Sequence, residues 1–186
     1  MADKKEKQTF NTKVFECCGD DKLRPVMQCV HFLNGFAYAH NGFMGIKQTI
    51  SFQSILNPEF LDGHSLHRDS YKSIMGFDIA EANGVGVECW NDNGQTAFFE
   101  YFEYPEGEVM PDIEQTMKIK RGLVNLGFIG IDPDLLQKIS RALYVPNNHA
   151  VRMQFTGVDS AILIDVPGVD DQAAVLMPKI INGTLF

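Results

Sequence analysis

Alternating apolar and polar residues in the first third of the chain predict an antiparallel meander. Asn-Gly pairs at 34–35 and 41–42 stand between the apolar runs, and such a pair is the strongest short-range sign of a tight turn between two strands. A further run at 12–17, TKVFEC, fits a short strand ahead of the meander. The three strands that the turns separate are expected at Val26–Leu33, Phe36–His40 and Phe43–Phe52.

Two later segments have the spacing of a helix. The first, HSLHRDSYKSIM, precedes Gly76, which stands where a helix-terminating glycine is common. The second helix is expected to begin at Asp132, an N-cap residue that Pro133 follows. Apolar residues near one face of the first helix are Leu66, Tyr71, Ile74 and Met75, and those of the second are Leu135, Leu136, Ile139, Ala142 and Leu143.

Strands follow both helices, so that one unit recurs along the chain. Three strands are expected around turns at Asn83-Gly84 and Asn93-Gly94, and three more in HAVRMQFTG, SAILIDVPG and QAAVLMPKI. A unit of one strand, one helix and three strands thus occurs about three times, although the helix of the first unit is at most a single turn near GDDK (19–22). We expect a flexible tail at 1–11, a two-unit domain at 12–103, a connector at 104–127 and a third unit at 128–186.

Composition places the chain among ordinary globular proteins. With 186 residues, of which 45% are hydrophobic, it can bury a core without disulfides or metals. The N-terminal MADKKEKQ is charged with no apolar stretch behind it, and nowhere do about 18 apolar residues follow one another, so we expect neither a signal peptide nor a membrane-spanning helix. The cysteines form no CxxC pair and are interpreted as free thiols of a cytoplasmic protein: Cys17, Cys18, Cys29 and Cys89.

Four stretches resemble the DNA sliding clamps, and most of all the bacterial type, the beta subunit of DNA polymerase III. They are LRPVMQCVHFLNGFAYAHNG, HSLHRDSYKSIM, EYPEGEVMPDI and AAVLMPKI, whose Met-Pro pair stands at the end of the last strand, as in the clamp's closing strand. The resemblance covers most of residues 12–180. It implies an α+β, DNA-clamp-like fold of repeated strand-helix-three-strand units, with antiparallel sheets outside and helices on one inner face.

The resemblance also implies that basic residues of the helices face DNA phosphates. Such contacts need no base reading and depend strongly on salt. The net charge of −8 disfavours non-specific DNA binding unless the cations gather on one face, and the same side chains also fit an ordinary solvated surface. The candidates are Lys22 and Arg24, where the first helix would lie, and Arg68, Lys72, Lys138 and Arg141 on the later helices.

Clamps of this type also bind short peptides of polymerases and repair proteins in an apolar groove. Met177 and Pro178 are the candidates for such a partner groove, and ordinary packing at a strand end is the alternative. The leading hypothesis is a non-enzymatic, sliding-clamp-like protein of DNA replication or of a mobile element. It would bind DNA backbone, replication proteins or both, form a homo-oligomer, and use no cofactor and no membrane. The alternatives are a protein-interaction module that does not bind DNA, and a small-ligand-binding domain.

Other candidate chemistry is sparse. His64 and His67 lie near Asp69, but the spacing provides no fourth metal ligand, and no serine or cysteine has an evident base partner. The aromatic residues of the second unit favour core packing over base stacking, because alternation divides them between two faces. They are Trp90, Phe98, Phe99, Tyr101 and Phe102. A pocket at Trp90 would support the small-ligand hypothesis.

Overall fold

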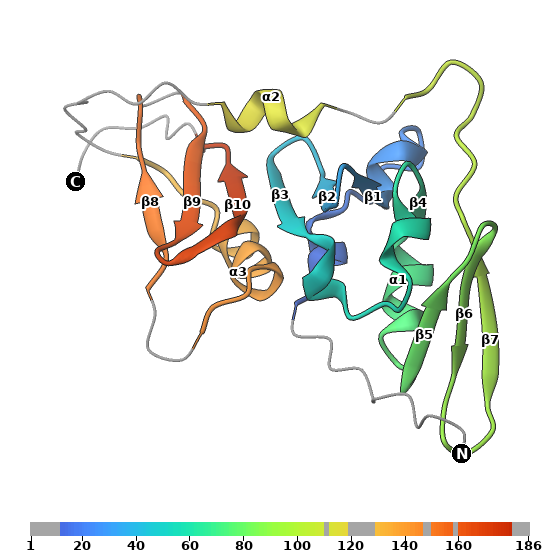
Figure 1. Ribbon diagram of the computed structural model, residues 1–186. Helices are drawn as coiled ribbons and strands as arrows, with labels where there is room; N and C mark the ends of the chain where they lie inside the picture. The colour runs from blue at the N-terminus through green and yellow to red at the C-terminus, as the bar shows by residue number, and fades with distance from the viewer. Residues whose placement is uncertain (1–11, 110–111, 119–128, 147–149, 158–159, 180–186) are drawn as a thin grey trace.

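The computed structural model describes residues 12–109, 112–118, 129–146, 150–157 and 160–179. Within them the chain forms one larger and one smaller antiparallel sheet with short helices (Figure 1); the predicted tail at 1–11 lies outside the described residues. The α-helices are α1 (Arg68–Ile74), α2 (Ile113–Met117) and α3 (Pro133–Ala142), and the 3-10 helices are η1 (Val14–Cys17), η2 (Pro25–Gln28), η3 (Ile50–Gln53) and η4 (Pro58–Leu61). The strands are β1 (Cys29–Leu33), β2 (Phe36–His40), β3 (Met44–Thr49), β4 (Ser65–His67), β5 (Ile79–Ala82), β6 (Gly86–Trp90), β7 (Thr96–Glu100), β8 (Arg152–Gln154), β9 (Ile162–Val166) and β10 (Val169–Leu176).

The larger sheet combines strands from both ends of the chain. In the described residues its order is β4-β1-β2-β3-β10-β9-β8, and each neighbouring pair is antiparallel. The predicted Asn-Gly turns connect β1 to β2 and β2 to β3. Gln48 of β3 stands opposite Gln172 of β10, 124 residues further along the chain. The division into 12–103, 104–127 and 128–186 stays a prediction, and strands of the first and last of these segments share this sheet.

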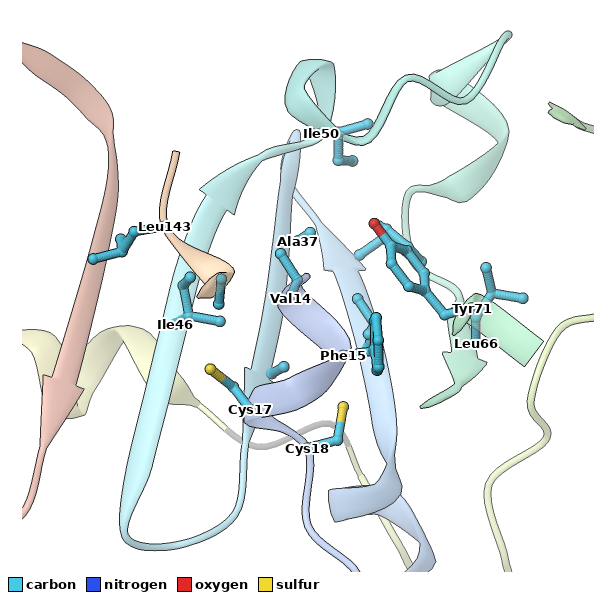
Figure 2. Close-up of a cluster of buried hydrophobic side chains, with 14 of the residues drawn as sticks. Val14, Phe15, Cys17, Cys18, Ala37, Ile46, Ile50, Leu66, Tyr71 and Leu143 are labelled. Carbon is cyan, nitrogen blue, oxygen red and sulfur yellow. The ribbon is translucent and has the colours of Figure 1, made fainter. Parts of the chain in front are cut away.

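One face of the larger sheet carries η1, α1 and α3. The short helix η1 contacts α1, α3 and strands β1 to β3, while α1 rests on β1 and β4 and α3 rests on β3 and β10. Val14 and Phe15 of η1 point into the core (Figure 2), where the rings of Phe15 and Tyr71 lie 6.3 Å apart. The segments around Tyr71 and Leu136 are therefore both helical and lie on one side of the sheet. This arrangement confirms the predicted α+β class, with antiparallel strands and with helices on one face of the larger sheet.

The smaller sheet packs against the same core. Its order is β5-β6-β7, and buried residues of β5 and β6, such as Ala80 and Val87, belong to one hydrophobic cluster with Tyr71 of α1. Phe99 packs against this cluster, whereas Phe98, its neighbour in β7, is 44% exposed. The order β4, α1, β5, β6, β7 confirms the predicted unit of strand, helix and three strands. None of the helices in the described stretches has the length and apolar character needed to cross a bilayer.

The prediction of a strand at 12–17 is wrong. Val14–Cys17 form a 3-10 turn, and the amide of Lys13 donates to the carbonyl of Arg141 at the end of α3 at 3.1 Å. Consecutive residues Val14 and Phe15 are both buried, so contacts on several sides, and not the alternation of a strand, fix this segment. This turn takes the place of the first unit's helix, which the sequence analysis placed at 19–22.

Other predicted boundaries shift by a few residues. The run that begins at Val26 starts with η2, so β1 begins only at Cys29, and β3 ends at Thr49, where η3 follows. Gly76 follows α1 without adopting the left-handed conformation expected of a terminating glycine; the cap position is Met75, in the right-handed region. The connector contains a short helix, α2, which the sequence analysis missed.

A buried amide network fixes the helix side of the sheet. The Nε2 of Gln48 donates to Gln172 Oε1 at 2.9 Å and to the carbonyl of Ala142 at 3.3 Å. The Oε1 of the same side chain accepts from Thr12 Oγ1 and from Gln53 Nε2, each at 2.8 Å. Because Gln48 is fully buried, these four bonds replace those it would make to water.

His31 is buried on the opposite face of β1. Its Nδ1 lies 2.9 Å from Ser65 Oγ and 2.9 Å from the hydroxyl of Tyr104, and its Nε2 has no partner among the described residues. Burial, with the ring of His40 at 6.5 Å as a smaller cause, lowers the pKa of His31 to about 4. The connector therefore covers a histidine that stays neutral near pH 7.

We expect Gln48→Ala to lower the free energy of unfolding by about 3 kcal/mol. The substitution leaves the buried Thr12 Oγ1 and Gln53 Nε2 without their partner, and it removes one of the two donors to Gln172 Oε1, which keeps the amide of Tyr144. Urea unfolding monitored by circular dichroism measures the change. The matched control is Gln137→Ala on the exposed side of α3, for which we expect a change within about 0.5 kcal/mol. Equal losses in the two variants would contradict the role of the network.

We expect the stability of the protein to fall as the pH drops from about 6.5 to about 4. The unfolded chain protonates His31 with an ordinary pKa near 6.5, whereas the folded chain protonates it only at about 4, so the unfolded state takes up the proton first and gains stability. The difference between the two pKa values of His31 corresponds to a loss of roughly 3 kcal/mol in the free energy of unfolding at the acid end of this window. Urea midpoints at several pH values should fall less steeply for His31→Gln than for the natural chain, and parallel curves would refute this assignment. Part of the slope should persist, because burial also lowers the pKa of His40.

Candidate functional site

The predicted DNA-binding residues gather on the helix side of the larger sheet. Arg68 and Lys72 lie on α1, and Lys138 and Arg141 lie on α3, with η1 between the two helices. Lys22 and Arg24 lie in the turn before η2 and are exposed. The structure therefore brings the four helix residues to one face, while the other two belong to a loop and not to a helix.

Carboxylates already engage several of these cations. Arg68 donates to the carbonyl of Gly19 at 3.0 Å and forms an ion pair with Asp20, so that it ties the segment after η1 to the start of α1. The guanidinium of Arg141 lies 3.3 Å from the carboxylate of Glu16 on η1. These two arginines therefore hold the helical layer together.

The remaining cations differ in how accessible they are to an anion. Arg24 lies 3.9 Å from Asp21, and no ion pair within 4.0 Å involves Lys22, Lys72 or Lys138 in the part of the chain that the structure describes. Lys72 is exposed and Lys138 is half-buried. The basic side chains of the helix-lined face that remain accessible to a phosphate are therefore lysines, because both arginines of the helices already pair with carboxylates.

An apolar groove lies on the opposite face of the sheet, where the β2–β3 turn, the start of α2 and the end of β10 meet. Its volume is about 120 Å³. Met177, one of the two predicted groove residues, lies on its wall and is 39% exposed. Pro178 is half-buried and is not part of the lining. The lining consists of His40, Gly42, Phe43, Met44, Gly45, Asp112, Ile113, Val175 and Met177.

The Asn-Gly turn shapes one wall of this groove. The side-chain oxygen of Asn41 accepts from the amides of Phe43 and Met44, each at 2.9 Å. Gly42 has φ +87°, a conformation that favours glycine. The amide of Met177 donates to the carbonyl of Phe43 at 2.8 Å. Local turn chemistry and a bond to the last strand therefore place Phe43, 65% exposed, beside Met177.

The second wall comes from α2, which crosses the ends of β3 and β10 (Figure 1). A Cβ at Gly45 would lie only 3.4 Å from side-chain carbons of Ile113 and Val175, so glycine allows α2 to approach the sheet closely. Glu114 anchors the helix, since it accepts from the hydroxyl of Tyr38 at 2.8 Å and forms an ion pair with Lys47.

The electrostatics of this wall follow from the same contacts. Hydrogen bonds from Lys47 and Tyr38 lower the pKa of Glu114, which remains ionised. Burial, and then the nearby Glu114 carboxylate, raise the pKa of Tyr38. Burial lowers the pKa of His40, so this groove residue is a neutral imidazole near pH 7. The groove is therefore apolar and uncharged except at Asp112, which caps α2 by accepting from the amide of Gln115 at 3.0 Å.

Sequence reasoning found only one wall of the groove. Met177 was a candidate, whereas His40, Phe43, Ile113 and Val175 were missed. These residues come from three segments far apart in the chain, and only the Asn-Gly turn before Phe43 left a local signal. Their meeting depends on the pairing of β3 with β10.

The other candidate residues have structural contacts. The ring of His64 stacks on Tyr101 with centroids 4.1 Å apart, and His67 Nδ1 accepts from the amide of Asp69 at 3.3 Å as the cap of α1. Among the described residues, no group of three or more His, Cys, Asp or Glu side chains is arranged to hold a metal ion. Trp90 lines an open hollow beside Phe98 on the smaller sheet.

Comparison with solved structures places this geometry in a known fold, although no family model and no curated protein matches the sequence. The chain is similar to the DNA polymerase III subunit beta of Pseudomonas aeruginosa, with 12% identity and a TM-score of 0.52 over 92% of this chain and 62% of that chain. It is also similar to the DnaN sliding clamp of Bartonella birtlesii bound to griselimycin (9% identity, TM-score 0.59, 91% and 63%). The DNA polymerase sliding clamp of Bacillus subtilis matches with 10% identity and a TM-score of 0.55 over 92% and 61%.

These matches agree with the resemblance seen in the sequence. The chain spans less than two thirds of the clamp chains that it matches. At such low identity the likeness concerns the fold, and the architecture described above agrees with it over nine tenths of the chain. The protein has a fold like that of the DNA polymerase III beta sliding clamps.

Proposed function

We propose that this protein is a non-enzymatic docking protein with a clamp-like fold, which binds a short apolar segment of a replication protein in the groove beside Met177. The observation that carries this proposal is the groove itself. It is apolar, it is built from three separate segments, and its rim includes exposed Phe43 and Met177. Exposed side chains of this size next to a cavity are typical of a protein-binding surface.

The size of the groove favours a peptide over a small metabolite. A volume of about 120 Å³ fits one or two apolar side chains, whereas pockets for small molecules usually measure about 300–1,000 Å³. A peptide that inserts one anchor and lies along the rim would bury both Phe43 and Met177. The same comparison makes the small-ligand alternative the weaker hypothesis at this site.

The similar structures support the choice of partner. They are subunits of DNA polymerase III, and one was solved bound to griselimycin. By analogy we propose that the partner is a polymerase or another replication protein, and that the protein acts in the cytoplasm, where its four buried cysteines would stay reduced.

We expect the groove variants Phe43→Ser and Met177→Ser, combined in one chain, to weaken peptide binding by about tenfold or more, because each loses apolar surface that the peptide would bury. The probe is a fluorescein-labelled peptide with adjacent Leu and Phe residues between serines, measured by fluorescence anisotropy. Both positions are exposed, so the fold should be unaffected.

The matched control for this experiment is Phe60→Ser, which removes an exposed phenylalanine of η4 (45% exposed) and should leave the affinity unchanged. A peptide in which serine replaces Leu and Phe should not bind. Equal affinity of the double variant and the natural chain would contradict the proposal that the peptide binds in this groove.

DNA contact by the helix-lined face is the second candidate function, and the accessible lysines favour it. Lys22, Lys72 and Lys138 make no ion pair within the described residues, and two of the helix arginines bind carboxylates. Since so few charges remain, we propose weak, salt-dependent binding to the DNA backbone. We also propose that encirclement of DNA would take several copies of the chain, that is, a homo-oligomer.

We expect the variant Lys72→Glu with Lys138→Glu to abolish DNA binding that is measurable at about 50 mM salt. In the single variants Lys72→Ala and Lys138→Ala, which should still bind, the salt slope should fall by about one each. Anisotropy with a labelled random-sequence duplex checks this. The control variant is Arg152→Glu, on the opposite face of the sheet, where Arg152 pairs with Asp165 at 2.8 Å. Affinity that is lost equally in both variants, or in neither, would argue against the helix-lined face as a DNA site.

A further inference from the structure

The smaller sheet ends in an edge strand that no other strand covers within the described residues. β7 pairs with β6 alone, and Figure 1 shows it at the outer side of the molecule. The opposite edge is protected, because Leu56 donates to the carbonyl of Ala80 at 2.9 Å and accepts from the amide of Ala82 at 3.0 Å. Natural sheets commonly protect an edge with lysine, proline or a bulge, but β7, with the sequence TAFFE, has none of these and pairs regularly.

Hollows lie on both faces of this edge strand. On the outer face one hollow is lined by Glu88, Cys89, Trp90, Thr96, Ala97 and Phe98. On the side of α1 a second is lined by His67, Ser70 and residues 98–103. Because successive side chains of a strand point to opposite faces, a segment added beside β7 would place alternate side chains over the two hollows. Phe98, 44% exposed, borders both.

The distribution of charge indicates what kind of segment would fit. Residues 73–117 include ten Asp and Glu and no Lys, Arg or His, while the rest of the chain carries 16 Lys and Arg against 14 Asp and Glu. Glu81 of β5 stands directly opposite Glu88 of β6, and Glu88 stands opposite Phe98 of β7. Like charges in this position destabilise a sheet, so cations that arrive beside β7 would stabilise it, whereas nucleic acid would be repelled.

We propose that β7 binds a lysine- or arginine-rich extended segment of another protein, which pairs with it as a fourth strand of the smaller sheet. Backbone hydrogen bonds to the edge of β7 would fix the register. The carboxylates of Glu88 and Glu100 would attract the cations, and the ring of Phe98 offers a face on which a cationic side chain can lie. This surface lies on the smaller sheet and is separate from the groove beside Met177.

Titration of the full chain with a synthetic peptide of alternating lysine and valine tests the proposal. Trp90 is the single tryptophan of the chain and lines the outer hollow, so its fluorescence reports binding at this site. We expect saturable binding that weakens by roughly tenfold between about 50 mM and about 300 mM NaCl. The variant Glu88→Lys with Glu100→Lys should weaken it by at least roughly tenfold. The control, Asp170→Lys with Asp171→Lys, changes the same charge at exposed positions of β10 and should bind as the natural chain does.

A second peptide separates strand pairing from simple charge attraction. Methylation of alternate backbone amides, on the side that faces β7, keeps the lysines but removes the donors, and it should abolish binding to the unmodified protein. Equal binding of the methylated peptide, or of a peptide with glutamate in place of lysine, would overturn the proposal. Trp90 fluorescence that changes with protein concentration in the absence of peptide would also overturn the proposal. It would instead indicate that a second copy of this chain binds at the edge.

Discussion

Strand β3 meets β10 over five residue pairs, from Met44 with Leu176 to Gln48 with Gln172. This pairing closes the chain on itself, because it joins the first meander to the last one. Its register is fixed from both sides of the sheet. On the helix side Gln48 bonds directly to the opposite residue, Gln172, and on the other side Gly45 allows Ile113 and Val175 to pack. A slip by one residue would turn both sets of side chains to the wrong face.

Two of the three surfaces to which we assign a function are consequences of this strand pair. On one side, α3 rests on β3 and β10 and meets η1, which in turn contacts α1, so the lysines of two helices share a face. On the other side, α2 packs across the same two strands and closes the groove between Phe43 and Met177. The helix-lined face and the groove thus lie on the two sides of one sheet. The positions of the elements on one side depend on the same strand pair as those on the other side.

The local features of this fold could be predicted from the sequence, whereas the long-range contacts could not. The turns at Asn34-Gly35 and Asn41-Gly42, the cap of α3 at Asp132 and the apolar face of that helix were predicted correctly, because neighbouring residues determine them. The segment at 12–17 was mistaken for a strand, since six residues can show alternation by chance and contacts with α1 and α3 decide its conformation.

The candidate sites differ in the same way between residues that the sequence indicated and residues that only long-range contacts bring together. Met177 and the basic residues of the helices became candidates through the resemblance to the sliding clamps, which places a Met-Pro pair at the end of the last strand and basic helix residues on one face. The groove residues contributed by α2 and the β2–β3 turn could not be found, since no local pattern indicates which strand β10 will pair with. The ion pairs of Arg68 with Asp20 and Arg141 with Glu16 were missed for the same reason.

Those ion pairs also bear on the function that we propose for the clamp-like fold. A surface that depended on phosphate would gain most from open arginine forks, which bind two oxygens at once, yet the two arginines of the helices hold carboxylates of neighbouring segments. The acidic residues of the smaller sheet are different, since no Lys, Arg or His lies in the sequence between Ile79 and Glu100. The chain therefore offers a nearly neutral face where clamps are expected to meet DNA, and an apolar groove and an acidic edge elsewhere. On this balance of charge and exposed apolar surface, protein binding is the stronger part of the function that we propose, and the proposed contact with DNA would depend on a few lysines.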